Sequence, residues 1–576
     1  RGLLRRAGML GRDLRWPAIG AFAAAAFGTA ARLAGPLTVG AGIERGVAEG
    51  DKRVVTVAAL VFLALLGVQY VFVQVSRYGL AWVSEQYLLR LRSIVFGHLV
   101  RSDIAFFSRS KSGVLVSRMT SDIESLQEFA GDGAVMAVSN GLTVIGVAVA
   151  MVLVDWRMAA STFVVIAVLI GVSVIFQRQA AKAYEQVRER IGRVLAGLQE
   201  GIAGVRVVQA FSQEQVQATS FGRVNEAHYR ANMSAAKAIS WYFPAVGFLR
   251  VVAIAAVLVI GGLRVIDGSL TFGTLVVFLL YLDWFFQPIV NLANVYNLLQ
   301  AAIAALAKLF NLLDVKAEVV ERPGAQDLAD PVAGEIVLSD VTFGYDNDTM
   351  VIQGIDLGIP AGQRLAVVGE TGAGKSTIAK LVLRYYDPQR GSVSIDGADL
   401  TDITIDSRTD AIALIPQDGF LFNGTLRDNL AYGAPDASDE DVWNVLRAMG
   451  IDDWVRDLPD GLETQVRERG GRFSAGERQL VALGRAFLDD PSVIVLDEAT
   501  SNLDPETELE VEGALRVLLA GRTAIVIAHR LRSAERADRV IMIGDGRIIA
   551  DGAHAELVES SDAYRRLVEV WERGMS

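Results

Sequence analysis

A glycine-rich segment carries the clearest chemical signal in this sequence. Residues 369–377 read GETGAGKST and satisfy the pattern G-x-x-x-x-G-K-[ST], whose glycines let the backbone wrap a phosphate without Cβ clashes. An apolar run at Leu365–Val368 precedes the segment and a helical pattern at Ile378–Leu383 follows it. Backbone N–H groups and a helix N-terminus then favour an anion. We expect a nucleotide to be bound by Gly369, Glu370, Thr371, Gly372, Ala373, Gly374, Lys375, Ser376 and Thr377.

A second signal lies at Ser492–Glu498, which reads SVIVLDE and predicts a buried strand that ends in two carboxylates. Ligands of α/β sheets bind at the carboxyl ends of strands. Asp497 is therefore expected to bind Mg²⁺, directly or through water, and Glu498 to orient and polarise an attacking water. In the glycine-rich segment, Lys375 is expected to reach the β and γ phosphates and Ser376 to bind Mg²⁺. By themselves, two adjacent acids could equally cap a helix.

The elements that position these residues form an α/β pattern from Glu335 onward. Short apolar runs alternate with helical stretches, among them Ser376–Leu383 and Arg478–Leu488, which predicts an α/β P-loop domain over residues 335–576. The predicted strands are Ile336–Leu338, Arg364–Val368, Ser392–Ile395, Ile412–Ile415, Val493–Leu496, Ala524–Ala528 and Val540–Ile543.

The first half of the chain has a different character, because it contains six long apolar runs. A helix that crosses a bilayer needs about 20 mostly apolar residues, so we expect an α-helical membrane domain over residues 1–310. A polar linker with Pro323, Gly324 and Pro331 follows at 311–334. A soluble helical bundle is the alternative, which the short polar links between runs disfavour. The runs are Trp16–Gly40, Val54–Leu80, Gly133–Val154, Met158–Phe176, Phe243–Leu263 and Leu270–Leu292.

The links between the runs predict the topology. Arg1–Arg15 holds five arginines, which places the N-terminus in the cytoplasm. The long, charged connections after the second and fourth runs then lie on the same side, and Leu88–Val100 and Ala180–Val194 predict that helices continue into them. We expect a multi-pass integral membrane protein with its nucleotide domain in the cytoplasm, in a bacterial inner (plasma) membrane.

Composition excludes several classes of function. The net charge of −11 is unlike the basic face of a nucleic-acid binder. The absence of cysteine excludes disulfides, thiolate metal sites and cysteine nucleophiles. The four histidines, which form no close zinc pair in the sequence, are His98, His228, His529 and His554.

Together these motifs make the C-terminal half resemble the nucleotide-binding domain of the ABC (ATP-binding cassette) superfamily. The resemblance implies an ATPase coupled to transport, with ATP and Mg²⁺ as cofactors. It implies that Tyr345 stacks on adenine, that Gln417 senses Mg²⁺ and couples to the membrane domain, and that His529 contacts the γ-phosphate. It also identifies two interface segments: the signature FSAGE (Phe473, Ser474, Ala475, Gly476 and Glu477) and the loop from Ser501 to Asp504.

The membrane half resembles the exporter-type ABC fold. Ala105–Asp122 is similar to the first cytoplasmic coupling region of that group, and Gly201–Glu214 to the stretch leading into the second. The resemblance implies that both segments touch nucleotide-binding domains, the second one on a partner chain. The chain is thus identified as a half-transporter of the exporter type.

A half-transporter must pair, because in this family ATP lies between the phosphate loop of one domain and the signature of another. Ser474 and Gly476 open a helix whose N-terminus can hold a γ-phosphate across that interface. The signature departs from the family's LSGGQ: Ala475 adds a methyl, and Glu477 adds a negative charge that is nonetheless favourable near a helix N-terminus. With Glu498 and His529 intact, we favour a heterodimer over a homodimer. The alternative that FSAGE is a tolerated variant of the signature, and that the chain forms a homodimer, stays open.

The resemblance implies alternating access driven by ATP, with a lipophilic or amphipathic substrate such as a lipid, a fatty acid or a drug. Ionisable residues inside spans are costly and often functional, so Arg32, Arg250 and Asp283 are substrate-site candidates, whereas Arg77 lies nearer a predicted span end. The arginines could instead pair with Asp283 or sit at a membrane interface. The direction of transport stays open.

An ATP-gated channel or regulator on the same fold is the main alternative function. The six apolar runs count against a soluble ABC ATPase and against an ATPase subunit of an uptake system.

Overall fold

The computed structural model describes residues 2–346, 349–417, 419–467, 470–497, 505–528 and 530–574. The chain divides into two units. The first contains Arg1–Arg101 and Lys111–Val315, and the second contains Ser102–Ser110 and Lys316–Ser576. Each unit is described by itself below.

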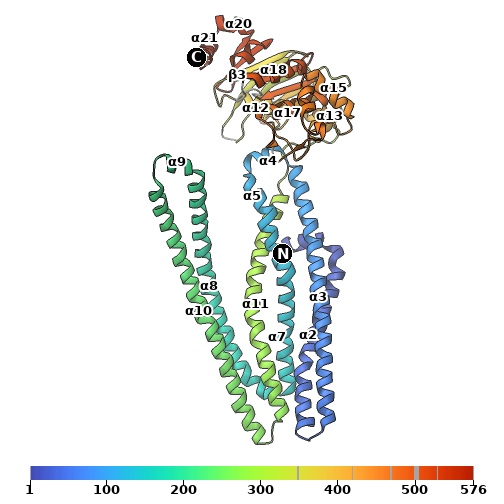
Figure 1. Cartoon of the computed structure of the whole chain (residues 1–576), viewed down its shortest axis with the longest axis vertical. Coiled ribbons are helices and arrows are strands. Elements are labelled where there is room, and N and C mark those ends of the chain that lie inside the picture. The colour runs from blue at the N-terminus through green and yellow to red at the C-terminus, as the bar shows by residue number, and fades with distance from the viewer. Residues whose placement is uncertain are drawn as a thin grey trace. The chain divides into compact units, whose positions relative to one another are not determined.

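The first unit consists of helices (Figure 1). Among the residues that the structure describes, six segments are long and apolar enough to cross a membrane. They contain the predicted apolar runs apart from the first two residues of the sixth. That run was expected to begin at Leu270, but the helix begins at Phe272 because the Thr271 hydroxyl accepts a hydrogen bond from the Thr274 N–H at 3.2 Å and caps it. The helices are α1 (Gly2–Leu10), α2 (Arg15–Ala41), α3 (Lys52–Val100), α5 (Ser112–Ser117), α6 (Ile123–Glu128), α7 (Ala134–Val154), α8 (Trp156–Ala203), α9 (Val205–Ala210), α10 (Glu214–Ile266) and α11 (Phe272–Leu313).

Three of these helices are much longer than a bilayer requires. Helices α3, α8 and α10 have 49, 48 and 53 residues, against the roughly 20 that span a membrane. Helices α8 and α10 run side by side and are joined by α9 (Figure 1). The predicted helical extensions beyond the membrane are therefore confirmed.

Buried aromatic side chains join neighbouring helices of the membrane unit. Tyr281 of α11 is fully buried and donates a hydrogen bond to the Leu33 carbonyl of α2 at 2.6 Å. Tyr242 of α10 stacks on Phe176 of α8 with ring centroids 3.9 Å apart, and its hydroxyl lies 3.1 Å from the Ser173 hydroxyl. Both phenols thus bury a large apolar ring while keeping their hydroxyl groups bonded.

The second unit combines two sheets with helices. One sheet has six strands in the order β12-β11-β3-β10-β9-β6, parallel except for β12, and the other has four antiparallel strands in the order β2-β1-β4-β5. A short pair, β7 with β8, completes the strands. The strands are β1 (Ile336–Phe343), β2 (Ile352–Ile359), β3 (Arg364–Gly369), β4 (Arg390–Ile395), β5 (Ala398–Asp399), β6 (Ile412–Ile415), β7 (Gly424–Thr425), β8 (Gln465–Val466), β9 (Val493–Asp497), β10 (Thr523–Ile527), β11 (Arg539–Gly544) and β12 (Arg547–Gly552).

The helices of this unit lie between and around the strands. They are α4 (Ile104–Arg109), α12 (Lys375–Val382), α13 (Ile405–Ala411), α14 (Leu426–Leu430), α15 (Asp439–Met449), α16 (Asp452–Asp457), α17 (Ala475–Leu488), α18 (Pro505–Leu518), α19 (Leu531–Glu535), α20 (His554–Ser560) and α21 (Asp562–Gly574).

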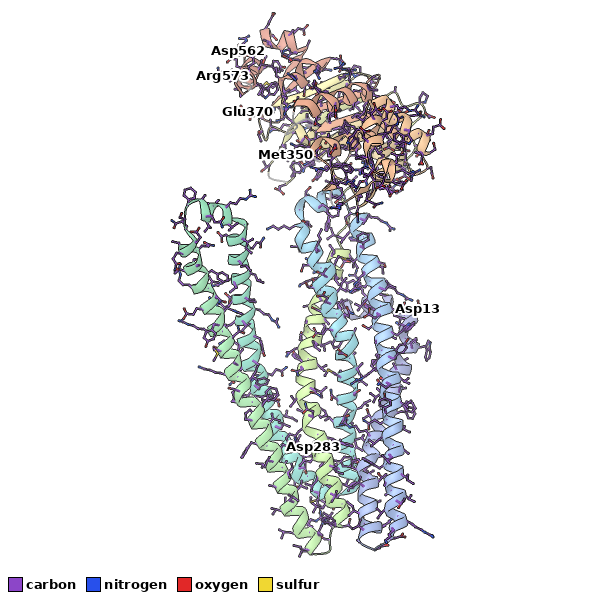
Figure 2. All side chains as sticks on the ribbon, viewed as in Figure 1. Asp13, Asp283, Met350, Glu370, Asp562 and Arg573 are labelled. Carbon is purple, nitrogen blue, oxygen red and sulfur yellow. The ribbon has the colours of Figure 1, made fainter. Side chains whose placement is uncertain are left out.

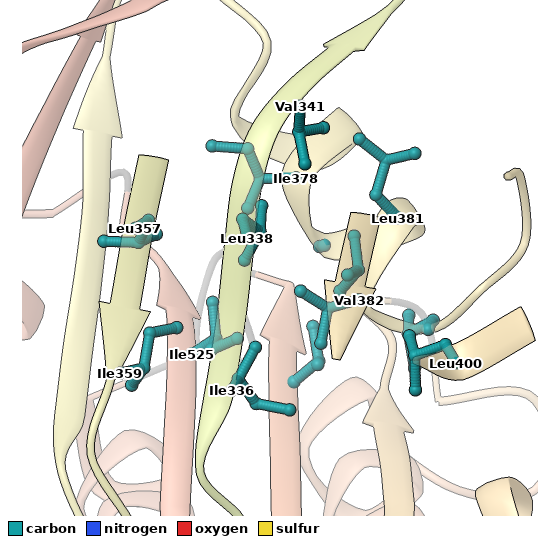
Figure 3. Close-up of a cluster of buried hydrophobic side chains, with 14 of the residues drawn as sticks. Ile336, Leu338, Val341, Leu357, Ile359, Ile378, Leu381, Val382, Leu400 and Ile525 are labelled. Atoms are coloured by element: carbon teal, nitrogen blue, oxygen red, sulfur yellow. The ribbon is translucent and has the colours of Figure 1, made fainter. Parts of the chain in front are cut away.

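One apolar core ties the two sheets together through α12 (Figure 3). Ile378 and Leu381 of this helix are buried against Leu338 of β1 and Ile525 of β10. Because α12 begins at Lys375, this packing fixes the position of the glycine-rich segment that precedes it.

The strands predicted from sequence are all present, with ends shifted by up to two residues apart from β1, which continues to Phe343. The sequence did not predict β2, β12 or the two-residue strands β5, β7 and β8. In β2, Ile352 and Ile355 are both buried although they are three residues apart, because Gly354 adopts a positive φ of 64° and shifts the register against β1. This irregularity breaks the period-two pattern by which a strand is read from sequence.

Candidate functional site

The glycine-rich segment forms a tight loop between β3 and α12. Gly369 has φ 144°, and a Cβ there would lie 2.3 Å from the Ile543 carbonyl oxygen. Gly374 has φ 109°, and a Cβ there would lie 2.8 Å from Cδ1 of Ile352. Both positions therefore require glycine, for conformation and for space. The loop is the backbone cradle expected from the sequence pattern.

Lys375 places its ammonium group inside this loop. The side chain is only 5% exposed, and Nζ donates hydrogen bonds to the carbonyl oxygens of Gly369 and Glu370 at 2.8 and 2.9 Å. Glu370 itself is an exposed residue at the loop surface (Figure 2). A cation is thus held at the point where a phosphate chain would enter the loop.

Tyr345 reaches the same loop from the end of β1. Its hydroxyl lies 3.1 Å from the Thr377 hydroxyl and accepts a hydrogen bond from Lys380 Nζ at 3.2 Å. The ring makes edge contacts with Phe343 and Tyr386, with centroids 5.2 and 5.3 Å away. The residue expected to stack on adenine is therefore fixed beside the phosphate loop.

The parallel register brings the other candidate residues to the same edge of the sheet. Ile527 of β10 pairs with both Val367 of β3 and Asp497 of β9, so Asp497 lies level with the strand that leads into the loop. Ile415 of β6 pairs with Leu496, and Gln417 follows two residues later. Asp497 is partly buried and Gln417 is exposed. The residues expected to bind Mg²⁺ thus lie at the same edge of the sheet as the phosphate loop.

Four predicted residues lie outside the described part of the chain. They are Glu498, Ser501, Asp504 and His529. Their assigned roles remain predictions.

The signature segment forms the start of α17, with Ser474 as its N-cap. The Glu477 N–H donates to Oγ of Ser474 at 3.2 Å, and the Ser474 N–H donates to Oε2 of Glu477 at 2.6 Å, which completes a capping box. Oε1 of Glu477 accepts a further hydrogen bond from the indole nitrogen of Trp454 at 2.9 Å. Both carboxylate oxygens are thus engaged within the domain, a role that sequence reasoning did not assign to Glu477.

Two residues that sequence reasoning did not assign join the signature helix to the segment around Gln417. Nε2 of Gln479 donates to the Pro416 carbonyl at 3.4 Å, and Gln479 is 2% exposed. A Cβ at Gly419 would lie 2.6 Å from the Arg478 carbonyl oxygen, so glycine is needed for this close approach. The signal available from the sequence was Gly419 itself, two residues after Gln417.

The first part of the predicted coupling region packs within the nucleotide-binding unit. Ala105 of α4 is 1% exposed and belongs to the core between the sheets. The Tyr386 hydroxyl donates to Oγ of Ser108 at 3.3 Å, and Arg109 pairs with Glu318. Helix α4 is therefore part of the nucleotide-binding unit.

Within the membrane unit, Asp283 of α11 (Figure 2) pairs with Arg250 of α10. The guanidinium of Arg32 lies over the ring of Trp284, 4.7 Å from its centroid. The three ionisable candidates line one pocket of about 440 Å³. Of the open alternatives, pairing with Asp283 thus holds for Arg250, whereas Arg32 makes a cation–π contact.

A second pocket in the membrane unit, of about 310 Å³, also contains Arg32, and Arg77 lines it as well. Ser76, which is 2% exposed, faces this pocket with a hydroxyl that has no hydrogen-bond partner among the described atoms. Arg77 was not among the residues predicted to bind substrate, because it lies near a predicted span end. Its neighbours depend on how α2, α3, α7 and α11 pack, which the sequence does not display.

A phosphate loop between a strand of a parallel sheet and a helix defines a P-loop ATPase domain. The same chain carries a membrane unit with six candidate spans among its described residues. Comparison with known proteins gives the family. Residues 18–289 match the model of the ABC transporter transmembrane region, and residues 352–501 match the ABC transporter model. This chain belongs to the ABC transporter family, as an exporter-type half-transporter.

Individual relatives agree with this assignment. The chain is 33% identical over 545 residues to the ABC transporter ATP-binding protein YknV of Bacillus subtilis, covering 94% of this chain and 90% of the relative. It is 34% identical to an ATP-dependent lipid A-core flippase of Syntrophus aciditrophicus, covering 85% and 81% of the two chains. It is 35% identical to a multidrug efflux ATP-binding/permease protein of Mycobacterium tuberculosis, of whose length it spans 46%.

A solved structure shows the same architecture. The chain superposes on a bacterial Atm1-family ABC exporter with ATP bound, with a TM-score of 0.80 and 26% identity, over 98% of this chain and 99% of the other. The predicted fold class, the ATPase activity coupled to transport and the multi-pass membrane location with a cytoplasmic ATPase domain are thereby confirmed.

Proposed function

We propose that this chain pairs with a second half-transporter and uses ATP to move a lipophilic or amphipathic substrate across the membrane by alternating access. The observation that carries the proposal is the presence of one phosphate loop and one signature helix in a single nucleotide-binding unit. The N-terminus of α17 offers its backbone N–H groups to a phosphate held by another domain. Two such chains complete the sites that one chain leaves open.

The residues around the phosphate loop fit ATP with Mg²⁺. Lys375 supplies a buried cation, and Ser376, Gln417 and Asp497 supply the oxygen ligands that Mg²⁺ prefers. The metal ion, when bound, neutralises charge that develops on the phosphates. Glu498 and His529 are proposed to orient water and to contact the γ-phosphate, as the family resemblance implies.

We favour a heterodimer over a homodimer. Ala475 adds a methyl group at the start of α17, where a phosphate approaches the backbone, while Glu498 and His529 are retained in the sequence. This combination supports a heterodimer in which this chain supplies the hydrolytic residues of one site and a changed signature to the other. The capping role of Glu477 supports the alternative, in which FSAGE is a working variant in a homodimer.

The substrate is proposed to be a lipid, a fatty acid or a drug. The pocket with Arg32, Arg250 and Asp283 joins charged groups with Phe243, Trp284 and Phe286, as an amphipathic molecule requires. The relatives named as a lipid A-core flippase and a multidrug efflux protein support this class.

Reconstitution tests the proposal. The chain, alone and co-expressed with a candidate second half-transporter, is placed in liposomes that contain a fluorescent fatty acid and a fluorescent phospholipid. ATP-dependent movement of either probe, absent in Lys375→Ala, supports transport. Ion current that needs ATP binding but no hydrolysis, with no probe movement, would instead indicate an ATP-gated channel.

A further inference from the structure

The helices that cover one face of the six-stranded sheet leave a gap above β10. This strand lies in the middle of the sheet, and Ile525 and Ile527 are 0% and 1% exposed, yet Val526 between them is partly exposed. The strands of a parallel sheet are normally buried on both faces. The exposure of a central valine therefore marks an opening in the layer formed by α18 and α19.

The opening is a pocket of about 350 Å³ with an apolar floor and apolar sides. Leu496 of β9 and Val526 of β10 form the floor, and Leu515, Leu519 and Ala537 form the sides. The volume lies in the range of about 300–1,000 Å³ that is usual for small-molecule sites.

Two ion pairs join the elements on either side of the pocket. Glu512 of α18 pairs with Arg536, which directly follows α19, at 2.9 Å, and Glu508 of α18 pairs with Arg530, which directly precedes α19. The carboxylate of Glu512 is the acid that lines the pocket, and it is already neutralised by Arg536. The pairs keep the walls of the pocket in place and leave its remaining charge positive.

That remaining charge comes from three arginines. Arg364, Arg516 and Arg532 line the pocket, and among the described residues none of their guanidinium groups has a hydrogen-bond or ion-pair partner. Arg364 stands at the start of β3, where its backbone N–H is bonded to Asp538 at 2.8 Å but its side chain is not. An apolar floor with unpaired guanidinium groups around it is complementary to a molecule that is acidic at one end and apolar at the other.

We propose that this pocket between α18 and α19 binds an anionic amphiphile, distinct from both ATP and the transported substrate. The apolar body lies on Leu496 and Val526, and the carboxylate or phosphate head is bound by Arg364, Arg516 and Arg532. The proposal does not depend on the proposed function. Since Leu496 directly precedes Asp497, a bound molecule contacts the same strand whose end carries the Mg²⁺ candidate.

A cysteine-protection experiment tests this proposal on the full chain in lipid nanodiscs without nucleotide. The chain has no cysteine, so Ser533→Cys places a single thiol in the pocket wall, and Ser560→Cys places one on exposed α20 as the control. The rate of alkylation by a soluble maleimide is measured with octyl phosphate, octyltrimethylammonium or inorganic phosphate. We expect octyl phosphate to slow modification at position 533 at least severalfold, with no effect at position 560 and no effect of the other two probes.

Variants in the Ser533→Cys background locate the effect. Arg364→Gln and Arg532→Gln each remove an unpaired charge and should weaken protection by octyl phosphate about tenfold, whereas Arg547→Gln on exposed β12 should leave it unchanged. Val526→Trp should fill the pocket and abolish protection, with a melting curve to show that the domain is folded. The proposal is overturned if octyl phosphate gives no protection, if the cation or inorganic phosphate protects equally, or if Arg547→Gln matches the two pocket variants.

Discussion

Glu477 accepts a hydrogen bond from the indole nitrogen of Trp454 at 2.9 Å, while its other carboxylate oxygen accepts the Ser474 N–H. The charge that distinguishes this signature from the family pattern is therefore directed back into its own domain, onto a helix N-terminus where a carboxylate is favourable. Capping explains the acid, so under the proposed function the change in the signature that bears on phosphate binding is the methyl group of Ala475.

The capping role predicts how Glu477 variants behave. Glu477→Gln keeps an oxygen for the cap and should change the free energy of unfolding by less than about 0.5 kcal/mol. Glu477→Ala loses the cap and should cost about 1 kcal/mol. Trp454→Phe, which removes only the indole donor, is the matched control. Denaturant unfolding and ATP hydrolysis are measured together. A large gain in hydrolysis for Glu477→Gln would show that the carboxylate repels nucleotide after all.

The two inner glycines of the phosphate loop form a matched pair. Both have positive φ, but a Cβ at Gly374 would lie 2.8 Å from Ile352, whereas a Cβ at Gly372 has nothing within 4 Å. Alanine at either position costs roughly 1–2 kcal/mol of conformational strain, and Gly374→Ala adds the clash. We expect Gly374→Ala to lose binding of a fluorescent ATP analogue and Gly372→Ala to retain a larger part of it. Equal loss in both would mean that space around the loop does not matter.

The sequence predicted most of the nucleotide site because its residues are local. Gly369 to Thr377 lie in one strand–loop–helix unit, and Asp497 ends a strand whose five residues are mostly apolar. What it could not predict depends on packing between distant elements. The hydrogen bond from Trp454 to Glu477 joins residues that are 23 positions apart in the sequence. Arg77 lines the same pocket as Arg32 because of the way α2 and α3 pack. Strand β2 was missed because the turn at Gly354 disrupts its alternation.

Asp155 joins two short links of the membrane unit. It caps α8 by accepting the Met158 N–H at 2.9 Å and pairs with Arg264 at 2.9 Å, and both charged side chains are largely buried. The hydrogen bond from Arg264 holds the pKa of Asp155 below its usual value of 3.8. Asp155→Asn should lower the free energy of unfolding by about 1–3 kcal/mol at neutral pH, measured by thermal unfolding in detergent.

The pH dependence of this pair follows from the sign of the pKa shift. A carboxyl whose pKa is depressed on folding contributes stability above its unfolded pKa and loses it as pH falls through the folded value. The difference between Asp155→Asn and the parent chain should therefore be constant from about pH 5 to 8 and shrink below about pH 4. Glu189→Gln, which breaks the exposed Glu189–Arg193 pair, should have little effect at any pH. Equal effects of the two variants would contradict a special role for Asp155.

The ion pair between Arg250 and Asp283 predicts selectivity for acidic substrates. Arg250→Ala should reduce transport of a labelled fatty acid about tenfold while changing transport of its neutral alcohol analogue little. Asp283→Asn releases Arg250 from its partner and should preserve or increase fatty-acid transport. If both probes respond equally to Arg250→Ala, the pair holds helices together and does not bind substrate.

We propose that each chain supplies half of each ATP site and that this chain carries the hydrolytic half. It is tested most directly by the ATPase rate of the chain purified alone in lipid, beside its Glu498→Gln variant and beside the chain co-purified with a second half-transporter. We expect little hydrolysis by the chain alone and brisk hydrolysis with the partner, and we expect Glu498→Gln to abolish it. Brisk hydrolysis by the chain alone, lost in the variant, would show a working homodimer. Hydrolysis that persists in Glu498→Gln under every condition would show that this chain does not carry the hydrolytic half-site.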